Sequence, residues 1–313
     1  MAHFDQQKAY AAQETTFAKL ILNNQFDDGR EVELLHFIYN HPSAATFRGS
    51  PSGVLGAIDE YGRTKKYLMN VGEDKGKLVT SLIAERKPQY MVELGGYVGY
   101  SAILFGNAVR RAGGKRYFSL ERNPEFAAVI MALVDLAGLS DIVKVQVGPS
   151  AESIKRLQGN GSLSHIDLMF LDHYKPAYTT DLKLCEELGL ITPGTVLAAD
   201  NVIKPGNPPY LEYVRSSIQQ KREKYGKVNG LAGADAQFAD RTRKQYAKRI
   251  ADEDLTNESL GNPNLVYESK LIHSFEPTGV PSMKDGVEIT RCVGEEHGPG
   301  GPLTPPSPAE GFH

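Results

Sequence analysis

The chain has 313 residues and a mass of 34.3 kDa, which allows one elaborated α/β domain with extensions. Its 35 Lys and Arg residues nearly balance 38 Asp and Glu residues, so a broad basic surface for nucleic acid is excluded. No apolar run approaches the roughly 20 residues that span a bilayer, and no secretory pattern opens the chain. Two cysteines, Cys185 and Cys292, cannot build a disulfide framework or a Cys-rich zinc site. We therefore expect a cytoplasmic enzyme that binds neither nucleic acid nor membrane.

The first 52 residues are polar, and only Arg30–Tyr39 has a strong helical pattern, so we interpret 1–52 as an N-terminal helical extension. From residue 54 to about 217, apolar strands alternate with helical patterns, which is typical of βαβ units and a mostly parallel sheet. The predicted strands are Tyr90–Leu94, Arg116–Leu120, Ile142–Val147, Ile166–Leu171 and Thr195–Ala199, and the predicted helices are Ser101–Arg111, Pro124–Ala137, Ser150–Gln158 and Tyr178–Leu188.

The C-terminal third changes composition twice. Residues 219–264 are dense in charged and polar residues, which indicates a surface insertion, partly helical at Ala239–Ile250. A β-like pair returns at Leu265–His273 and Gly286–Val293, so the main domain is predicted to span 53–293. The Pro- and Gly-rich tail, 294–313, cannot bury enough apolar surface to order itself.

Acidic residues mark the ends of four of the five predicted strands, namely Glu93, Glu121, Asp172 and Asp200. In an open parallel sheet, ligands bind at the carboxyl ends of the strands. Any one of these acids could be an ordinary helix cap or loop residue. Four of them at one edge of the sheet favour a ligand site.

The loop after the first strand is rich in glycine, with Gly95, Gly96 and Gly99 before a predicted helix. Such a turn lets backbone N–H groups approach a ligand, although a glycine-rich turn without a ligand is the simpler alternative. Tyr97 stands where the second glycine of the dinucleotide pattern belongs, so the loop suits a ligand without a pyrophosphate. Glu121 lies where a carboxylate binds ribose hydroxyls in nucleotide-binding folds. Together these features favour S-adenosylmethionine over NAD, and an acidic cleft suits its cationic sulfonium.

Asp172, Asp200 and Asn201 form an all-oxygen set at neighbouring strand ends. Such ligands fit Mg²⁺, less well Ca²⁺ or Mn²⁺, and do not fit zinc; the alternative is that Asp200 and Asn201 only shape a turn. Lys175 lies three residues after Asp172. A neighbouring cation would favour its neutral form, so it could act as a general base, whereas alone it would be an ordinary loop lysine.

The chain resembles the animal-type catechol O-methyltransferases. We expect it to be a fungal relative with insertions. The resemblance runs almost continuously over 31–217 and returns loosely at 265–293. The matching runs are Ala57-Ile58-Asp59, Met69 to Gly76 (MNVGEDKG), Val92 to Ser101 (VELGGYVGYS), Glu121-Arg122-Asn123-Pro124, Phe170 to Lys175 (FLDHYK) and Thr195 to Ile203 (TVLAADNVI).

The resemblance implies a Rossmann-like class I methyltransferase fold, with seven mostly parallel strands, the last antiparallel, and helices on both faces. It also implies roles for individual residues. The cofactor would contact Val71, Glu93, Gly95, Tyr97, Ser101, Glu121, Ser150, Asp172 and His173; Mg²⁺ would be held by Asp172, Asp200 and Asn201; the substrate would contact Tyr67, Tyr174, Lys175, Asn201, Pro205 and Glu276; and Lys175 and Glu276 would be catalytic.

The sequence departs from the family at several positions. Tyr67 and Tyr174 stand where the animal enzymes have tryptophans beside the substrate, while Pro205 matches the third wall residue. Ala151 replaces a glutamine that contacts adenine, and Glu276 aligns with the substrate-side glutamate only across a gap. The insertion at 219–264 has no counterpart. We therefore expect a roomier, more polar substrate rim.

The resulting hypothesis is methyl transfer from S-adenosylmethionine to one hydroxyl of a small aromatic vicinal diol, with Mg²⁺ and a lysine base. A close alternative is a metal-dependent O-methyltransferase for another vicinal oxygen pair, such as a caffeoyl-type ester or a secondary metabolite. A non-catalytic adenosyl-ligand binding protein and a nicotinamide-dependent dehydrogenase are disfavoured by the Lys175 and metal-ligand set and by the glycine spacing. The oligomeric state is left open, with a monomer favoured.

Overall fold

A computed structural model of the chain describes residues 6–10, 27–225, 259–277 and 284–296. The predicted helix Ala239–Ile250 lies outside these ranges. Of the tail predicted to be disordered, 294–313, residues 294 and 295 belong to the last strand, and residues beyond 296 lie outside these ranges. The described helices are α2 (Arg30–Tyr39), α3 (Pro51–Thr64), α4 (Gly72–Arg86), α5 (Tyr100–Arg111), α6 (Pro124–Leu136), α7 (Ser150–Gly159), α8 (Ala177–Glu187), α9 (Pro208–Arg215) and α10 (Ile218–Lys224), with short turns η1 (Gln6–Lys8), η2 (Ala44–Thr46) and η3 (Val202–Gly206).

Seven strands form one mixed sheet in the order β3-β2-β1-β4-β5-β7-β6. The strands are β1 (Tyr90–Leu94), β2 (Arg116–Glu121), β3 (Val143–Val147), β4 (Leu168–Leu171), β5 (Val196–Ala199), β6 (Leu265–Phe275) and β7 (Lys284–Glu295). The first five pair in parallel, and β7 is antiparallel to both β5 and β6. This is the predicted Rossmann-like methyltransferase topology, and it is confirmed.

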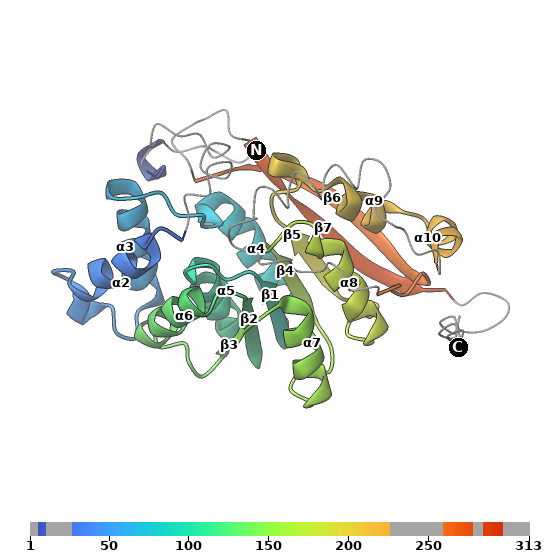
Figure 1. Ribbon diagram of the computed structural model, residues 1–313, viewed down its shortest axis with the longest axis horizontal. Coiled ribbons are helices and arrows are strands. Elements are labelled where there is room, and N and C mark those ends of the chain that lie inside the picture. Colours follow the sequence, from blue (N-terminus) through green and yellow to red (C-terminus); the bar gives the residue numbers. More distant parts are fainter. Residues whose placement is uncertain (1–5, 11–26, 226–258, 278–283, 297–313) are drawn as a thin grey trace, which may run out of the picture.

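Helices cover both faces of the sheet, as Figure 1 shows. One buried cluster joins apolar residues of α2 to α6 with alternate strand residues such as Met91 and Phe170. The other joins α7, α8 and α9 with the intervening strand residues, such as Val92 and Leu171. Because side chains alternate across a strand, each apolar run serves both clusters. None of the described helices is long and apolar enough to cross a membrane.

Polar caps and prolines set where several helices begin. Ser50 accepts the Gly53 N–H at the start of α3, and Asn123 accepts N–H groups at the start of α6. Pro51 and Pro124 follow these caps, where a missing N–H costs nothing. The loops after β1, β2, β4 and β5 lie at the same edge of the sheet because these strands pair in parallel.

The β6–β7 pair brings distant residues to that same edge. Because β7 runs antiparallel to β5, its first residues lie beyond the carboxyl end of β5, with Ala199 paired to Glu288. The end of β6 lies beside them, since Phe275 pairs with Lys284. Glu276 and Asp285 therefore reach the strand ends that carry Asp172 and Asp200.

Candidate functional site

A cavity of about 570 Å³ opens at the carboxyl ends of β1, β2, β4 and β5. Its wall contains residues that the sequence analysis placed in one site, from all four strand ends and from the segment after β6. The predicted site residues that line it are Val71, Gly95, Tyr97, Ser101, Glu121, Ser150, Asp172, His173, Tyr174, Lys175, Asp200, Asn201, Pro205 and Glu276.

Two predicted site residues lie behind this wall. Glu93 is fully buried, and its Oε2 accepts a hydrogen bond from the Ser119 hydroxyl at 2.6 Å. Tyr67 is 2% exposed, and its carbonyl accepts a hydrogen bond from Arg30 at 2.7 Å. Both residues can act on the cavity through their packing and charge, but neither is part of its surface.

The glycine turn after β1 is shaped by close backbone contacts. Gly95 has a φ of +88°, and a Cβ there would lie 2.7 Å from the Asp172 carbonyl oxygen. Glu121 Oε2 accepts the N–H groups of Gly96 at 3.1 Å and Tyr97 at 2.9 Å. Burial raises the pKa of Glu121, and backbone N–H groups partly offset this. The Glu121 carboxylate thus fixes the turn while lining the cavity.

A second part of the wall is organised by Asp181, which the sequence analysis did not single out. Its carboxylate accepts a hydrogen bond from the Ser150 hydroxyl and lies 2.9 Å from His173 Nε2. The His173 ring stacks on Tyr178, with centroids 4.8 Å apart. His173 Nδ1 is buried and has no hydrogen-bond partner within the described residues. An unpartnered polar atom beside a cavity is consistent with a site that binds a polar ligand.

Lys175 is 4% exposed, although it follows β4 in a loop. Its ammonium group donates to Asp172 Oδ1 at 3.0 Å and to the Tyr178 hydroxyl at 2.8 Å. The Tyr178 hydroxyl in turn donates to the Asp200 carbonyl at 3.2 Å. The lysine is therefore held between two of the strand ends rather than extended into solvent.

A buried charge cluster lies next to Lys175 and is centred on Lys75 of α4, a residue that sequence reasoning missed. The fully buried Lys75 Nζ donates to Asp200 Oδ1 at 2.7 Å, to Asp285 Oδ2 at 2.9 Å, and to Glu276. The Asn201 amide nitrogen lies 2.9 Å from both Glu276 Oε1 and Asp285 Oδ2. These contacts bring together α4, β5, β6 and β7.

The three carboxyl groups of the cluster differ in the direction of their pKa shifts. Burial raises the pKa of Asp200 and of Glu276, and the nearby Lys75 ammonium offsets this only in part. Asp285 is also buried, but its pKa is lowered, because Lys75 and backbone N–H groups stabilise its ionised form. For Lys75 itself, attraction to three carboxyl groups outweighs burial and raises the pKa. The cluster therefore holds excess negative charge that protons or a cation can neutralise.

The donor chemistry of this edge fits a hard divalent cation. Asp172, Asp200 and Asn201 line the same cavity and offer only oxygen ligands, as Mg²⁺ prefers. Asp200, Glu276 and Asp285 also have oxygens within 4.8 Å of one another, but Lys75 Nζ is bonded to all three. A cation among these three groups would have to displace Lys75, whereas a cation at Asp172, Asp200 and Asn201 would compete with Lys175 for Asp172 and with Lys75 for Asp200.

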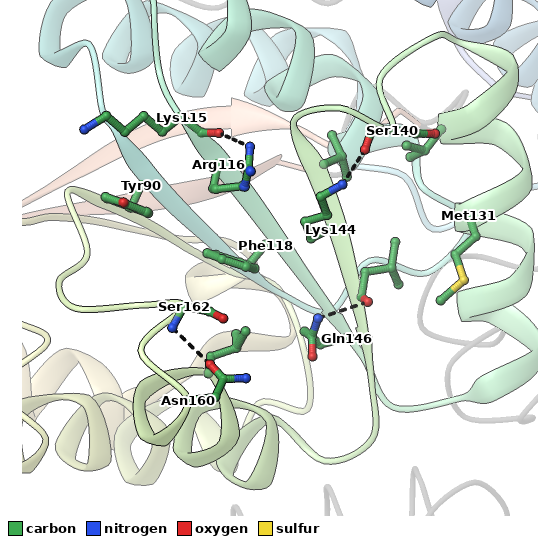
Figure 2. A pocket seen from close by; sticks show the side chains of 14 residues that line it. Tyr90, Lys115, Arg116, Phe118, Met131, Ser140, Lys144, Gln146, Asn160 and Ser162 are labelled. Carbon is green, nitrogen blue, oxygen red and sulfur yellow. Dashed lines mark hydrogen bonds between the residues drawn. The ribbon is translucent and has the colours of Figure 1, made fainter.

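A larger hollow of about 910 Å³ lies elsewhere, along the outer strands (Figure 2). Tyr90, Lys115 and Arg116 at the amino ends of β1 and β2 line it, together with Lys144 of the edge strand β3. None of the predicted site residues lines it. Because ligands of open α/β sheets bind at the carboxyl ends of the strands, the smaller cavity is the candidate active site.

Comparisons with known proteins agree with this geometry. The O-methyltransferase family model matches residues 58–222. The catechol O-methyltransferase of Bos taurus is 40% identical over 199 residues, which cover 64% of this chain and 71% of the relative. Catechol O-methyltransferase B of Danio rerio is 40% identical over 192 residues, covering 61% and 70%. A solved structure of a candidate O-methyltransferase from Klebsiella pneumoniae has 19% identity and a TM-score of 0.50, covering 83% of this chain and 99% of that chain.

The fold and the family match define the chain as an O-methyltransferase. Within that class, the identity to the curated relatives shows that it belongs to the catechol O-methyltransferase family. The predicted family and enzyme class are confirmed.

Proposed function

We propose that this chain transfers the methyl group of S-adenosylmethionine to one hydroxyl of a catechol-type vicinal diol, with Mg²⁺ bound and Lys175 as the base. The observation that carries the proposal is the position of Lys175, whose ammonium lies 3.0 Å from Asp172 Oδ1 in the wall that also contains Asp200 and Asn201. A base beside an oxygen-only ligand set is the arrangement that deprotonation of a chelated phenol requires.

Four features support S-adenosylmethionine as the methyl donor. The Gly95–Gly96 turn offers a close backbone approach, Glu121 lies where ribose hydroxyls are bound, and His173 keeps a buried nitrogen unpartnered within the described residues. The excess negative charge nearby suits a sulfonium cation. Ala151 also lines the cavity, and its methyl group offers no hydrogen bond to an adenine ring.

When bound at Asp172, Asp200 and Asn201, Mg²⁺ would orient two adjacent substrate oxygens and lower the pKa of a phenol. It would also compete with the Lys175 ammonium for Asp172, which favours neutral lysine. Lys175, held in place by its hydrogen bond to Tyr178, would then remove the phenol proton. Glu276 would bind the second hydroxyl, and the cavity would hold the oxygen and the methyl carbon at near-attack distance.

Replacing the base provides the first test. Lys175→Met keeps the length of the side chain and removes the amine, so we expect kcat to fall by roughly 10²–10⁴-fold with little change in the affinity for S-adenosylhomocysteine measured by calorimetry. Lys183→Met is the matched control, because Lys183 lies on the neighbouring α8 against Tyr213 and does not line the cavity. Wild-type turnover in Lys175→Met would exclude this lysine as the base.

A substrate panel provides the second test and separates the catechol hypothesis from its alternatives. Catechols, caffeoyl-type esters and singly hydroxylated analogues are compared by mass spectrometry of the products, with and without EDTA. We expect only vicinal diols to be methylated, and Mg²⁺ to restore activity after EDTA. Equal methylation of a singly hydroxylated analogue, insensitive to EDTA, would contradict a chelated substrate. Tyr174 and Pro205 line the cavity whereas Tyr67 lies behind it, so the panel also measures how far these walls restrict the substrate.

A further inference from the structure

The orientation of the Asn201 side chain is fixed by its neighbours. Its amide nitrogen lies 2.9 Å from Glu276 Oε1 and 2.9 Å from Asp285 Oδ2. An ionised carboxylate only accepts hydrogen bonds, so the amide that faces Asp285 must present its nitrogen. The amide oxygen must then point the other way, and Asn201 lines the candidate cavity.

Asp285 is the more constrained of the two acceptors. Its Oδ2 accepts from Lys75 Nζ at 2.9 Å as well as from Asn201, and its Oδ1 accepts the N–H groups of Ile203 at 3.2 Å and Lys204 at 2.9 Å. All four partners are donors, which requires an ionised acceptor. The same carboxylate therefore holds both the Asn201 side chain and the backbone that follows it.

Asp285 is not placed to hold the cation itself. It is fully buried and does not line the cavity, whereas Asp200, Asn201 and Glu276 do. Its oxygens are occupied by donors of the protein, and a cation among Asp200, Glu276 and Asp285 would have to displace the buried Lys75 ammonium. Asp285 can therefore act on a cation only through the residues that it orients.

We propose that Asp285, held by Lys75, is a positioning residue that turns the amide oxygen of Asn201 toward the divalent-cation site. This inference rests on the proposed function, in which Asn201 is a ligand of that cation. Partners that orient metal ligands in this way typically contribute 10–100-fold to metal affinity. The proposal thus predicts an effect on metal binding that is separate from any effect on cofactor binding.

The test measures Mn²⁺ binding to the full-length protein without substrate, by electron paramagnetic resonance of the free ion. Asp285→Asn cannot accept all four hydrogen bonds, so we expect the Kd for Mn²⁺ to rise about 10–100-fold. The affinity for S-adenosylhomocysteine should stay near that of wild type. Wild-type Mn²⁺ affinity in a folded Asp285→Asn protein would overturn the inference.

Glu288→Gln is the matched control. Glu288 is equally buried on the same strand and is bonded to Arg215 and Ser269, without a contact to Asn201. It should keep the wild-type Kd for Mn²⁺ even where it lowers stability. An equal loss of Mn²⁺ affinity in Glu288→Gln would assign the effect to general damage of β7 and would also overturn the inference.

An exchange variant keeps the test valid where the single variant does not fold. Asn201→Asp combined with Asp285→Asn preserves the charge of the cluster. It also keeps a hydrogen bond between positions 201 and 285, but the donor is now at position 285. The residue at the ligand position 201 then offers a carboxylate. We expect its Kd for Mn²⁺ to lie within about tenfold of wild type, since the orienting bond worth 10–100-fold is restored. A larger loss in the folded exchange variant would count against the inference. Wild-type protein that binds no Mn²⁺ would instead contradict the metal site of the proposed function.

Discussion

Glu93 allows the effect of burial on a carboxyl group to be measured as a change in stability. It lies in β1 with no solvent exposure, and burial raises its pKa from an ordinary 4.5 to about 7. Between these two values the unfolded chain releases the proton while the folded chain retains it. The free energy of unfolding should therefore fall as the pH rises from about 4.5 to about 7, and remain level above it.

The magnitude follows from the shift in pKa. Each unit corresponds to 1.36 kcal/mol, so the contribution of Glu93 is at most about 3 kcal/mol. In Glu93→Gln this contribution is absent, and the glutamine side chain can still accept the Ser119 hydrogen bond. Urea denaturation of both proteins at pH 5 and pH 8 should show the variant gaining up to about 3 kcal/mol relative to wild type at the higher pH. Other titrating groups cancel in this difference, so identical pH dependences would refute the reasoning.

Two further substitutions test the packing of the site. Lys75→Met leaves the buried carboxyl cluster without its cation, and we expect urea denaturation to show a loss of about 3–5 kcal/mol; a loss below about 1 kcal/mol would mean that the cluster is not held together by this lysine. Gly96→Ala would place a Cβ 2.5 Å from Ser119 Oγ and 2.6 Å from Ile130 Cδ1, so we expect a loss of roughly 1–3 kcal/mol and weaker S-adenosylhomocysteine binding in calorimetry. Gly56→Ala is its control, since a Cβ at this helical position has no neighbour within 4 Å, and it should be stabilising by about 0.5–1 kcal/mol.

The parallel strands and the helices between them could be predicted because their signals are local. The first strand was predicted with its observed bounds, Tyr90–Leu94, and the others to within about two residues at each end. Helices α3 and α4 were not predicted. Both contain glycines, among them Gly56 and Gly76, which lower helix propensity, and their stability comes from packing on α5 and α2. Burial of this kind is decided by tertiary contacts.

The strand-end residues of the site were also predictable, because parallel topology brings the ends of neighbouring strands to one edge. Lys75 and Asp285 were not, since Lys75 lies 125 residues from Asp200 and 210 residues from Asp285 in the chain. In the sequence, Lys75 sits between an acid and a glycine, a pattern that is typical of a solvated helix residue. Only the meeting of α4 with β5 and β7 turns it into a buried counter-ion.

The charge of the assembled site gives an independent reason to expect a divalent cation. Within the described residues, the cluster and the Lys175 pair together contain four carboxyl groups, of Asp172, Asp200, Glu276 and Asp285, against two ammonium groups, of Lys75 and Lys175. Two negative charges are left when all six groups are ionised, which is the charge that one Mg²⁺ would neutralise. Without a cation, burial and, after it, this same excess of negative charge raise the pKa of Asp200 and of Glu276. Metal binding should therefore be coupled to the release of protons, which calorimetry in buffers of different ionisation enthalpy would measure; binding with no proton released at pH 6.5 would contradict this balance.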